Sequence, residues 1–264
     1  MSQKDEIISN FKNQEWSFDT LFPDFDLSLK RHSDKSYITS RCADYYLNIE
    51  NDISINKPKQ APYIITKSDG CSFWEIALEI ISSENSDLSL AEFKPEYIER
   101  VQKTLVSIKK NNPKIIGYLV DYVPFILIVK RNKALSLSTP HLFGAIILSE
   151  NLFYSKEDLE ITLVHELAHQ ELFLINLIDS LISEKFLSNM KYAPFQKKDR
   201  PPLGRLHASH ALFRMTEYSI ISKKQYSNKI KCDFGGMIES LDDCELSHLG
   251  KKILVRYKSF YNKI

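Results

Sequence analysis

The feature that most constrains this chain is a His-Glu-x-x-His pattern at residues 165–169, inside a long apolar segment. In a helix, residues four positions apart share one face, so His165 and His169 present two imidazoles toward one point. Two imidazole nitrogens placed in this way can bind one metal ion, at roughly 2.0–2.1 Å each for zinc. Glu166 lies beside them, where it can accept a proton from a metal-bound water or support a ligand. The spacing therefore predicts a metal site on a helix.

The residues around the motif predict that this helix is buried. Apolar side chains surround the motif on nearly every side: Leu163, Val164, Leu167, Ala168, Leu172, Phe173, Leu174, Ile175, Leu177 and Ile178. A helix of this kind lies in a protein core. We expect it to run from about Lys156 to about Leu187, with Ser155 as its N-cap. Buried histidines need polar partners, and a metal ion is a partner that satisfies both.

Composition narrows the classes of function. The 35 Lys and Arg residues nearly balance the 34 Asp and Glu residues, so the charge predicts neither a nucleic-acid partner nor a basic membrane-binding patch. No apolar run reaches the ~18 residues of a membrane span, and no apolar segment follows the N-terminus as it does in a secretory signal. The four cysteines form no C-x-x-C pair, which is typical of free thiols in a reducing compartment. We therefore expect a cytoplasmic protein.

Helical periodicity recurs through the chain, and strand-like segments are confined to its middle. Helices are expected at about 37–49, 73–82, 89–110, 204–222 and 236–261, the last of them broken near Gly250. Strands are expected at 115–122, 125–129 and 143–148, and a proline-rich loop at 189–202. These elements predict an α+β fold, mainly helical with a small, mostly antiparallel sheet, and zincin-like around the long helix. Residues 1–112 are expected to form a helical part that wraps the core. Residues 113–264 are expected to form the metal-binding catalytic part.

A catalytic metal site usually needs a third protein ligand, and the sequence offers few. A metzincin has Gly three residues and His six residues after the second motif histidine, but this chain has Leu172 and Ile175 there. A gluzincin takes a Glu from a following helix, and Glu217 is the option of that kind. His207 and His210 lie on the same expected helix, and their spacing lets both point the same way. Any of these three residues can complete the site.

Four short segments carry a resemblance to a known family. They are LVHELAH at 163–169, YAPF at 192–195, DRP at 199–201 and GRLHA at 204–208. Together they resemble the HExxH-domain enzymes encoded beside ribosomally synthesised peptide natural products, which follow their helix with Tyr-x-x-Trp, Arg-Pro and Leu-His-Gly/Ala elements. The resemblance covers roughly residues 140–220. Phe195 stands where that family usually has Trp, and Ala208 stands where Gly is common; both departures concern packing more than ligation.

The resemblance implies an enzyme that hydroxylates a side-chain β-carbon of a precursor peptide with Fe(II), 2-oxoglutarate and O₂. It implies that His165, His169 and His207 are the iron ligands. The distal carboxylate of 2-oxoglutarate needs a cationic fork, which suits Arg better than Lys. Arg200, in the Arg-Pro element, is the favoured residue, with Arg205 and Tyr192 as further candidates for the co-substrate site. Glu166 then supports a ligand or contacts the peptide.

Two other interpretations remain open on the sequence alone. In a zinc metallopeptidase, Glu166 would act as general base on a zinc-bound water, with Glu217 or His207 as third ligand. In a non-catalytic protein, the metal would stabilise a surface that holds a peptide. Metal content and the fate of a candidate peptide distinguish the three interpretations.

Overall fold

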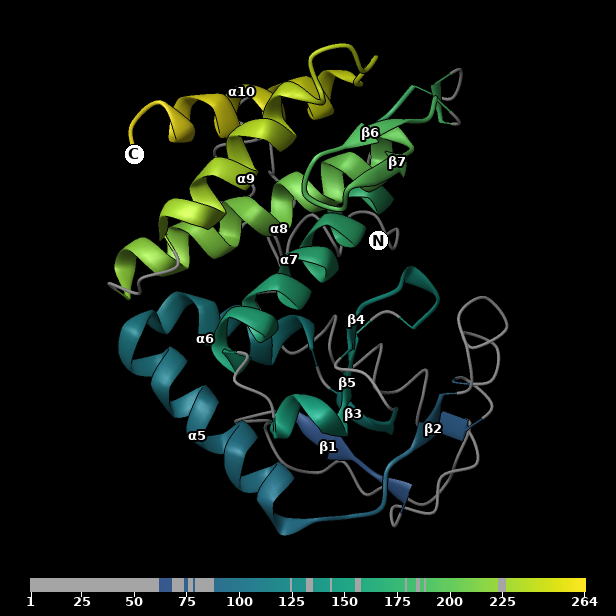
Figure 1. Cartoon of the computed structure of the whole chain (residues 1–264), viewed down its shortest axis with the longest axis vertical. Helices are drawn as coiled ribbons and strands as arrows, with labels where there is room; N and C mark the ends of the chain where they lie inside the picture. Colours follow the sequence, from purple (N-terminus) through teal and green to yellow (C-terminus); the bar gives the residue numbers. More distant parts are fainter. Residues whose placement is uncertain are drawn as a thin grey trace, which may run out of the picture. The chain divides into compact units, whose positions relative to one another are not determined.

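The structure is a computed structural model (Figure 1). It describes residues 62–264, except 68–73, 76, 77, 79–87, 124, 132–134, 143, 155–157, 179, 184, 185, 188 and 223–226. The helix expected at 37–49, most of the one expected at 73–82 and the expected N-cap Ser155 lie outside the described residues. Among the described helices, none is both long and apolar enough to cross a lipid bilayer.

The chain divides into two compact units, and the boundary falls inside helix α7 (Leu159–Ile178), between Gln170 and Glu171. The described elements that end before this boundary are a five-stranded sheet, two α-helices and two short 3₁₀ helices. Those after it are a short hairpin and three helices. The protein is thus mainly helical with a small sheet, as expected.

The sheet is mixed, with a parallel centre. Its strands are β1 (Tyr63–Ile65), β2 (Ser89–Leu90), β3 (Phe125–Lys130), β4 (Ser136–Leu137) and β5 (Ala145–Ser149). The central strand β3 pairs in parallel with β1 and β5, whereas β2 and β4 pair antiparallel to their neighbours. The prediction of a mostly antiparallel sheet is therefore wrong at its centre. The physical reason is that β3 and β5 are continuous apolar runs buried on both faces, which is typical of parallel strands.

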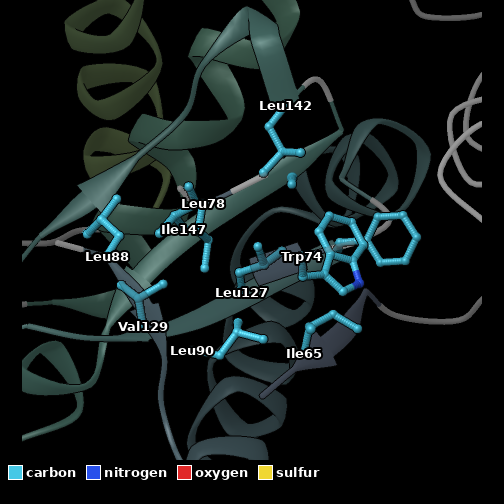
Figure 2. Packing of buried hydrophobic residues seen from close by; sticks show 11 residues of the cluster. Ile65, Trp74, Leu78, Leu88, Leu90, Leu127, Val129, Leu142 and Ile147 are labelled. Atoms are coloured by element: carbon cyan, nitrogen blue, oxygen red, sulfur yellow. The ribbon is translucent and has the colours of Figure 1, made fainter. Parts of the chain in front are cut away.

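Figure 2 shows the hydrophobic core on one face of this sheet. Leu127 and Val129 from β3 and Ile147 from β5 alternate along their strands and meet Ile65 and Trp74 there. The Trp74 ring packs against Phe125, with centroids 4.9 Å apart. The strand residues that point to the opposite face, Ile126, Ile128 and Ile146, are also fully buried, so both faces of the sheet are covered.

Helices α5 (Pro95–Asn111) and α6 (Pro113–Tyr122) lie in the same unit. Helix α5 confirms most of the helix predicted at 89–110, but it begins only at Pro95, because Ser89 and Leu90 form β2. The strand predicted at 115–122 is wrong, because these residues form α6. Asn112 caps this helix by accepting hydrogen bonds from the backbone N–H groups of Lys114 and Ile115, and Pro113 occupies its first turn. The periodicity of a short apolar run does not distinguish a strand from a helix. In this segment, the Asn112 cap and Pro113 favour the helix.

The second unit contains a hairpin of β6 (Lys191–Ala193) and β7 (Lys198–Arg200), helix α8 (Pro202–Ile221), helix α9 (Ser227–Glu239) and helix α10 (His248–Tyr261). The helix predicted at 204–222 is confirmed as α8. The loop predicted at 189–202 contains the hairpin. Helix α7 ends at Ile178, not near 187, because Ile182 forms a β-bridge with Leu246.

Helix α10 begins with a cap and a close approach. The Ser247 side chain accepts a hydrogen bond from the N–H of Gly250, so the break expected near Gly250 falls just before it. A Cβ atom at Gly250 would lie 2.4 Å from the carbonyl oxygen of Leu181, so only glycine fits there without a shift of the backbone.

Candidate metal centre

Helix α7 carries the His-Glu-x-x-His motif and is buried along most of its surface. The side chain of Asp158 accepts a hydrogen bond from the N–H of Glu160 and so caps its first turn. Leu163, Val164, Leu167 and Ala168 are fully buried, which confirms the prediction of a core helix. The rigid surroundings fix the direction in which the motif side chains point.

His165 and His169 converge at their Nε2 atoms, which lie 3.1 Å apart. Their ring centroids are 4.8 Å apart and the rings are nearly perpendicular, at 81°. Both side chains are half-buried, whereas the sequence interpretation took them to be enclosed; His165 is 23% exposed. The pair therefore presents its two nitrogens at an accessible surface of a rigid helix, where a metal ion could also reach a substrate.

The separation of the two nitrogens fits a shared metal ion. With bonds of roughly 2.05 Å, nitrogens 3.1 Å apart subtend an angle of roughly 98° at the metal. This angle lies between an octahedral angle of about 90° and a tetrahedral angle of about 109°. The donor set thus fits iron or zinc, since imidazole is a good ligand for both.

Glu166 is buried beside the pair and is incompletely hydrogen-bonded. Only 1% of the residue is exposed, and its Oε1 atom lies 3.9 Å from Nε2 of His165, which is too long for a hydrogen bond. Its Oε2 atom is buried and has no hydrogen-bond partner within the described part of the chain. Such a carboxylate oxygen costs free energy unless a further group binds it. A water or a peptide group on a metal held by His165 is a partner of the right kind.

His207 lies on α8 and packs against Phe173 of α7, with ring centroids 4.7 Å apart. The side chain keeps some solvent exposure, yet protein atoms crowd its ring. This burial, followed by the nearby His210, lowers the pKa of His207 well below its ordinary value. His207 is therefore neutral near pH 7 and has the lone pair that metal ligation requires.

His210 has another role, because both of its ring nitrogens are engaged. Its Nε2 lies 3.1 Å from Oε2 of Glu171, and its Nδ1 lies 2.6 Å from the hydroxyl of Tyr257. Burial lowers the pKa of His210 and raises that of Tyr257, so a neutral imidazole that donates to Glu171 and accepts from Tyr257 fits both contacts. His210 is thus a structural residue that connects α7, α8 and α10.

Arg214 completes this buried cluster around Glu171. Its Nε and Nη2 atoms donate to the two carboxylate oxygens of Glu171, each at 2.9 Å, and its Nη1 donates to Glu217 at 2.6 Å. Burial alone would raise the pKa of Glu171, but Arg214 and His210 outweigh it and lower that pKa. Glu217 accepts a hydrogen bond from Arg214 at one carboxylate oxygen, which disfavours it as the gluzincin-like ligand. Sequence analysis missed the cluster, although a charged residue in the apolar run after His169 was a signal for it.

The three expected co-substrate residues lie on three elements. Tyr192 on β6 is 57% exposed, and Arg200 on β7 is half-buried. Arg205 on α8 is fully buried, and its Nη1 donates to the carbonyl of Ser240 and to Asp243. Its Nε and Nη2 atoms have no hydrogen-bond partner among the described residues. Because Arg205 precedes His207 by two residues, the two side chains leave α8 on opposite sides.

Within the described ranges, no three His, Cys, Asp or Glu side chains are grouped so that they could hold one metal ion. The structure brings together His165, His169 and Glu166, and the third ligand stays a prediction. No known protein-family model matches this chain, and no curated protein matches its sequence.

Proposed function

We propose that this protein is a non-haem iron enzyme that hydroxylates a side-chain β-carbon of a ribosomally synthesised precursor peptide in the cytoplasm. Bound Fe(II) would supply the oxidation chemistry: one oxygen atom of O₂ would enter the C–H bond as a hydroxyl group, and the other would enter succinate as 2-oxoglutarate loses CO₂. The observation that carries the proposal is the convergence of two imidazole nitrogens 3.1 Å apart beside a buried, incompletely bonded carboxylate. The choice of chemistry rests on the family resemblance.

His207 is the proposed third ligand. Of the two candidate histidines on α8, His210 has both ring nitrogens engaged, whereas burial keeps His207 neutral. The residue on which His207 packs, Phe173, follows His169 by one turn of α7 and therefore lies on the side of that helix that carries the motif. Both observations favour His207 over His210.

Arg200 is the proposed anchor for the distal carboxylate of 2-oxoglutarate. Arg205 leaves α8 on the side opposite to His207 and donates to Ser240, which disfavours it for a co-substrate held at His207. Arg200 belongs to the Arg-Pro element, and no such contact competes for it in the described part of the chain. Tyr192 lies on the neighbouring strand β6, where it pairs with Asp199, and its side chain is exposed. It is a further proposed contact for the co-substrate or the peptide.

A zinc metallopeptidase is the second candidate, and the position of Glu166 favours it specifically. A carboxylate beside one metal-binding histidine is where a metallopeptidase holds its general base. The non-catalytic peptide-binding alternative is the third, and it predicts metal with no product.

The experiment that separates these candidates starts from protein purified without oxygen. Its metal content is measured, and it is then incubated with Fe(II), ascorbate, 2-oxoglutarate and a candidate precursor peptide. Succinate release with a peptide heavier by one oxygen atom supports hydroxylation. A cleaved peptide in the presence of zinc overturns it, and bound metal with neither product identifies a binding protein.

One substitution sharpens the distinction. Glu166→Gln removes a general base, which costs a metallopeptidase on the order of 10²–10⁴-fold in rate. A hydroxylase that uses Glu166 only to position a ligand or the peptide retains measurable turnover. Glu239→Gln, the same change at an exposed position on α9, is the matched control.

A further inference from the structure

A groove of about 650 Å³ lies between α8 and α10, and the motif on α7 takes no part in it. Lys251, Lys252, Arg256 and Lys263 line it, with His248 at its start. The single acidic residue in its lining, Glu217, already accepts a hydrogen bond from Arg214. The groove is therefore strongly cationic in a protein whose formal net charge is only +1.

The floor of the groove is apolar. Phe213 of α8 and Phe260 of α10 pack edge to face, with centroids 4.9 Å apart, and Val255 is 66% exposed beside them. The Arg256 guanidinium lies 5.7 Å from the Phe213 ring. An occupant that matches this lining has negative charges at its edges and an apolar side chain between them.

The cations follow the length of α10 and do not converge on one point. From His248 to Phe260 the lining advances by twelve residue steps, or roughly 18 Å of helix at 1.5 Å per residue. A single phosphate or carboxylate would engage only part of this row, whereas an extended chain of about five or six residues spans it. The aromatic rings of the floor are packed in a cluster that includes Tyr257 and Phe234, which disfavours their use as stacking platforms for nucleic-acid bases.

We propose that the groove between α8 and α10 binds an acidic peptide segment, with its carboxylates on Lys251, Lys252, Arg256 and Lys263 and an apolar side chain on Val255 and Phe260. Binding at this groove is separate from the metal chemistry and holds whether or not the proposed hydroxylation is correct. If the hydroxylation is correct, the groove gives the enzyme a second attachment point for its substrate.

The electrostatic state of Arg256 agrees with such a ligand. Burial, followed by repulsion from Arg214, lowers the pKa of Arg256 below its ordinary value. An incoming carboxylate would offset both effects, because it adds a negative charge beside a desolvated guanidinium.

The test measures binding by fluorescence polarisation on the full chain. The probe is a labelled synthetic peptide of twelve residues with four aspartates around one phenylalanine, and the comparison probe has asparagine at those four positions. Lys251→Glu combined with Lys263→Glu, both exposed positions, is expected to weaken binding of the acidic probe at least about tenfold. Lys109→Glu combined with Lys110→Glu, exposed on α5 and equal in charge change, is expected to change it less than about twofold.

A second variant tests the apolar floor. Val255→Ser is expected to weaken binding of the phenylalanine probe. The affinity for a probe with glycine in place of phenylalanine is expected to stay the same. Equal affinity for the aspartate and asparagine probes, or no effect of the Lys251/Lys263 reversal, overturns the proposal. Tighter binding of a twelve-nucleotide oligouridylate than of the acidic peptide assigns the groove to RNA and also overturns it.

The N-terminal segment of the same chain, which carries Asp19, Asp24 and Asp26 among aromatic residues, is the competing occupant. Replacing these three aspartates by asparagine in the full chain tests it. Unchanged probe affinity supports a separate peptide as the ligand. A tenfold gain in probe affinity shows that this segment competes for the groove and overturns the assignment to a separate peptide.

Discussion

Helix α7 carries two sets of polar side chains within seven residues, and they differ in how completely they are bonded. In the first set, His165 and His169 are half-buried and Glu166 is buried, with no hydrogen-bond partner for its Oε2 atom in the described chain. Glu171, one turn later, is fully buried and has both oxygens bonded by Arg214 and one also by His210. One carboxylate thus has a buried oxygen left for a further group, whereas the other is fully engaged by protein side chains.

Disrupting the second set, Glu171 with Arg214 and His210, has the largest expected effect on stability. Arg214→Met leaves the Glu171 carboxylate buried without its bidentate partner, which should lower the free energy of unfolding by about 3–5 kcal/mol. The combined change Glu171→Leu with Arg214→Met should recover most of that loss, because no buried charge remains. Urea denaturation measures both. A single variant as stable as the parent would show that the cluster does not hold α7 to α8.

Gln170 lies between the two sets in the sequence and links α7 to the sheet. Its Oε1 accepts a hydrogen bond from the N–H of Gly144, and its Nε2 donates to the carbonyl of Ala145. Gln170→Met should lower the free energy of unfolding by about 2–3 kcal/mol, because both buried backbone groups lose their partners. Glu217→Gln, at a more exposed position, serves as a control with an expected loss below about 1 kcal/mol. Denaturation curves with the same urea gradient compare the two.

In the first set, replacing Glu166 should change the free energy of unfolding in the opposite direction. Glu166→Met removes a buried carboxylate oxygen that has no partner, so the metal-free protein should keep its stability or gain up to about 1 kcal/mol. Measuring unfolding with a chelator present removes any contribution from bound metal. A loss of 3 kcal/mol or more, as large as at Arg214, would mean that Glu166 is also structural.

The smallest expected effect on stability is at the histidine pair itself. His165→Ala and His169→Ala should each change the free energy of unfolding of the metal-free protein by less than about 0.5 kcal/mol, because both side chains are half-buried. Thermal melts with a chelator test this. In melts with added metal, the melting temperature should rise only for the parent protein. Equal stabilisation of parent and variants would place the metal elsewhere.

The sequence predicted the helices better than the sheet, for physical reasons. Periodicity and caps marked α5, α7 and α8, because burial on a helix repeats along one face. The prediction failed at residues 115–122, because a short apolar run fits a strand as well as a helix. It also failed at the centre of the sheet, because parallel pairing depends on segments far apart in the chain.

The candidate site divides in the same way. The i, i+4 spacing determined that His165 and His169 would meet, which their Nε2 contact confirms. The choice between His207 and His210 could not be made from spacing, because it depends on Tyr257, which lies 47 residues away in the chain and engages His210. Likewise, nothing near Arg205 in the sequence indicated that it would bond Ser240 on the far side of α8.

The central claim is that His165, His169 and His207 hold one metal ion, and anaerobic loading with Fe(II) followed by measurement of bound iron tests it most directly. We predict one iron per chain in the parent protein and in His248→Ala, and loss of at least about 90% of bound iron in each of the variants His165→Ala, His169→Ala and His207→Ala. Retention of one iron per chain in His207→Ala, with its fold intact, would contradict the third ligand. Retention in His165→Ala and His169→Ala would contradict the metal centre itself.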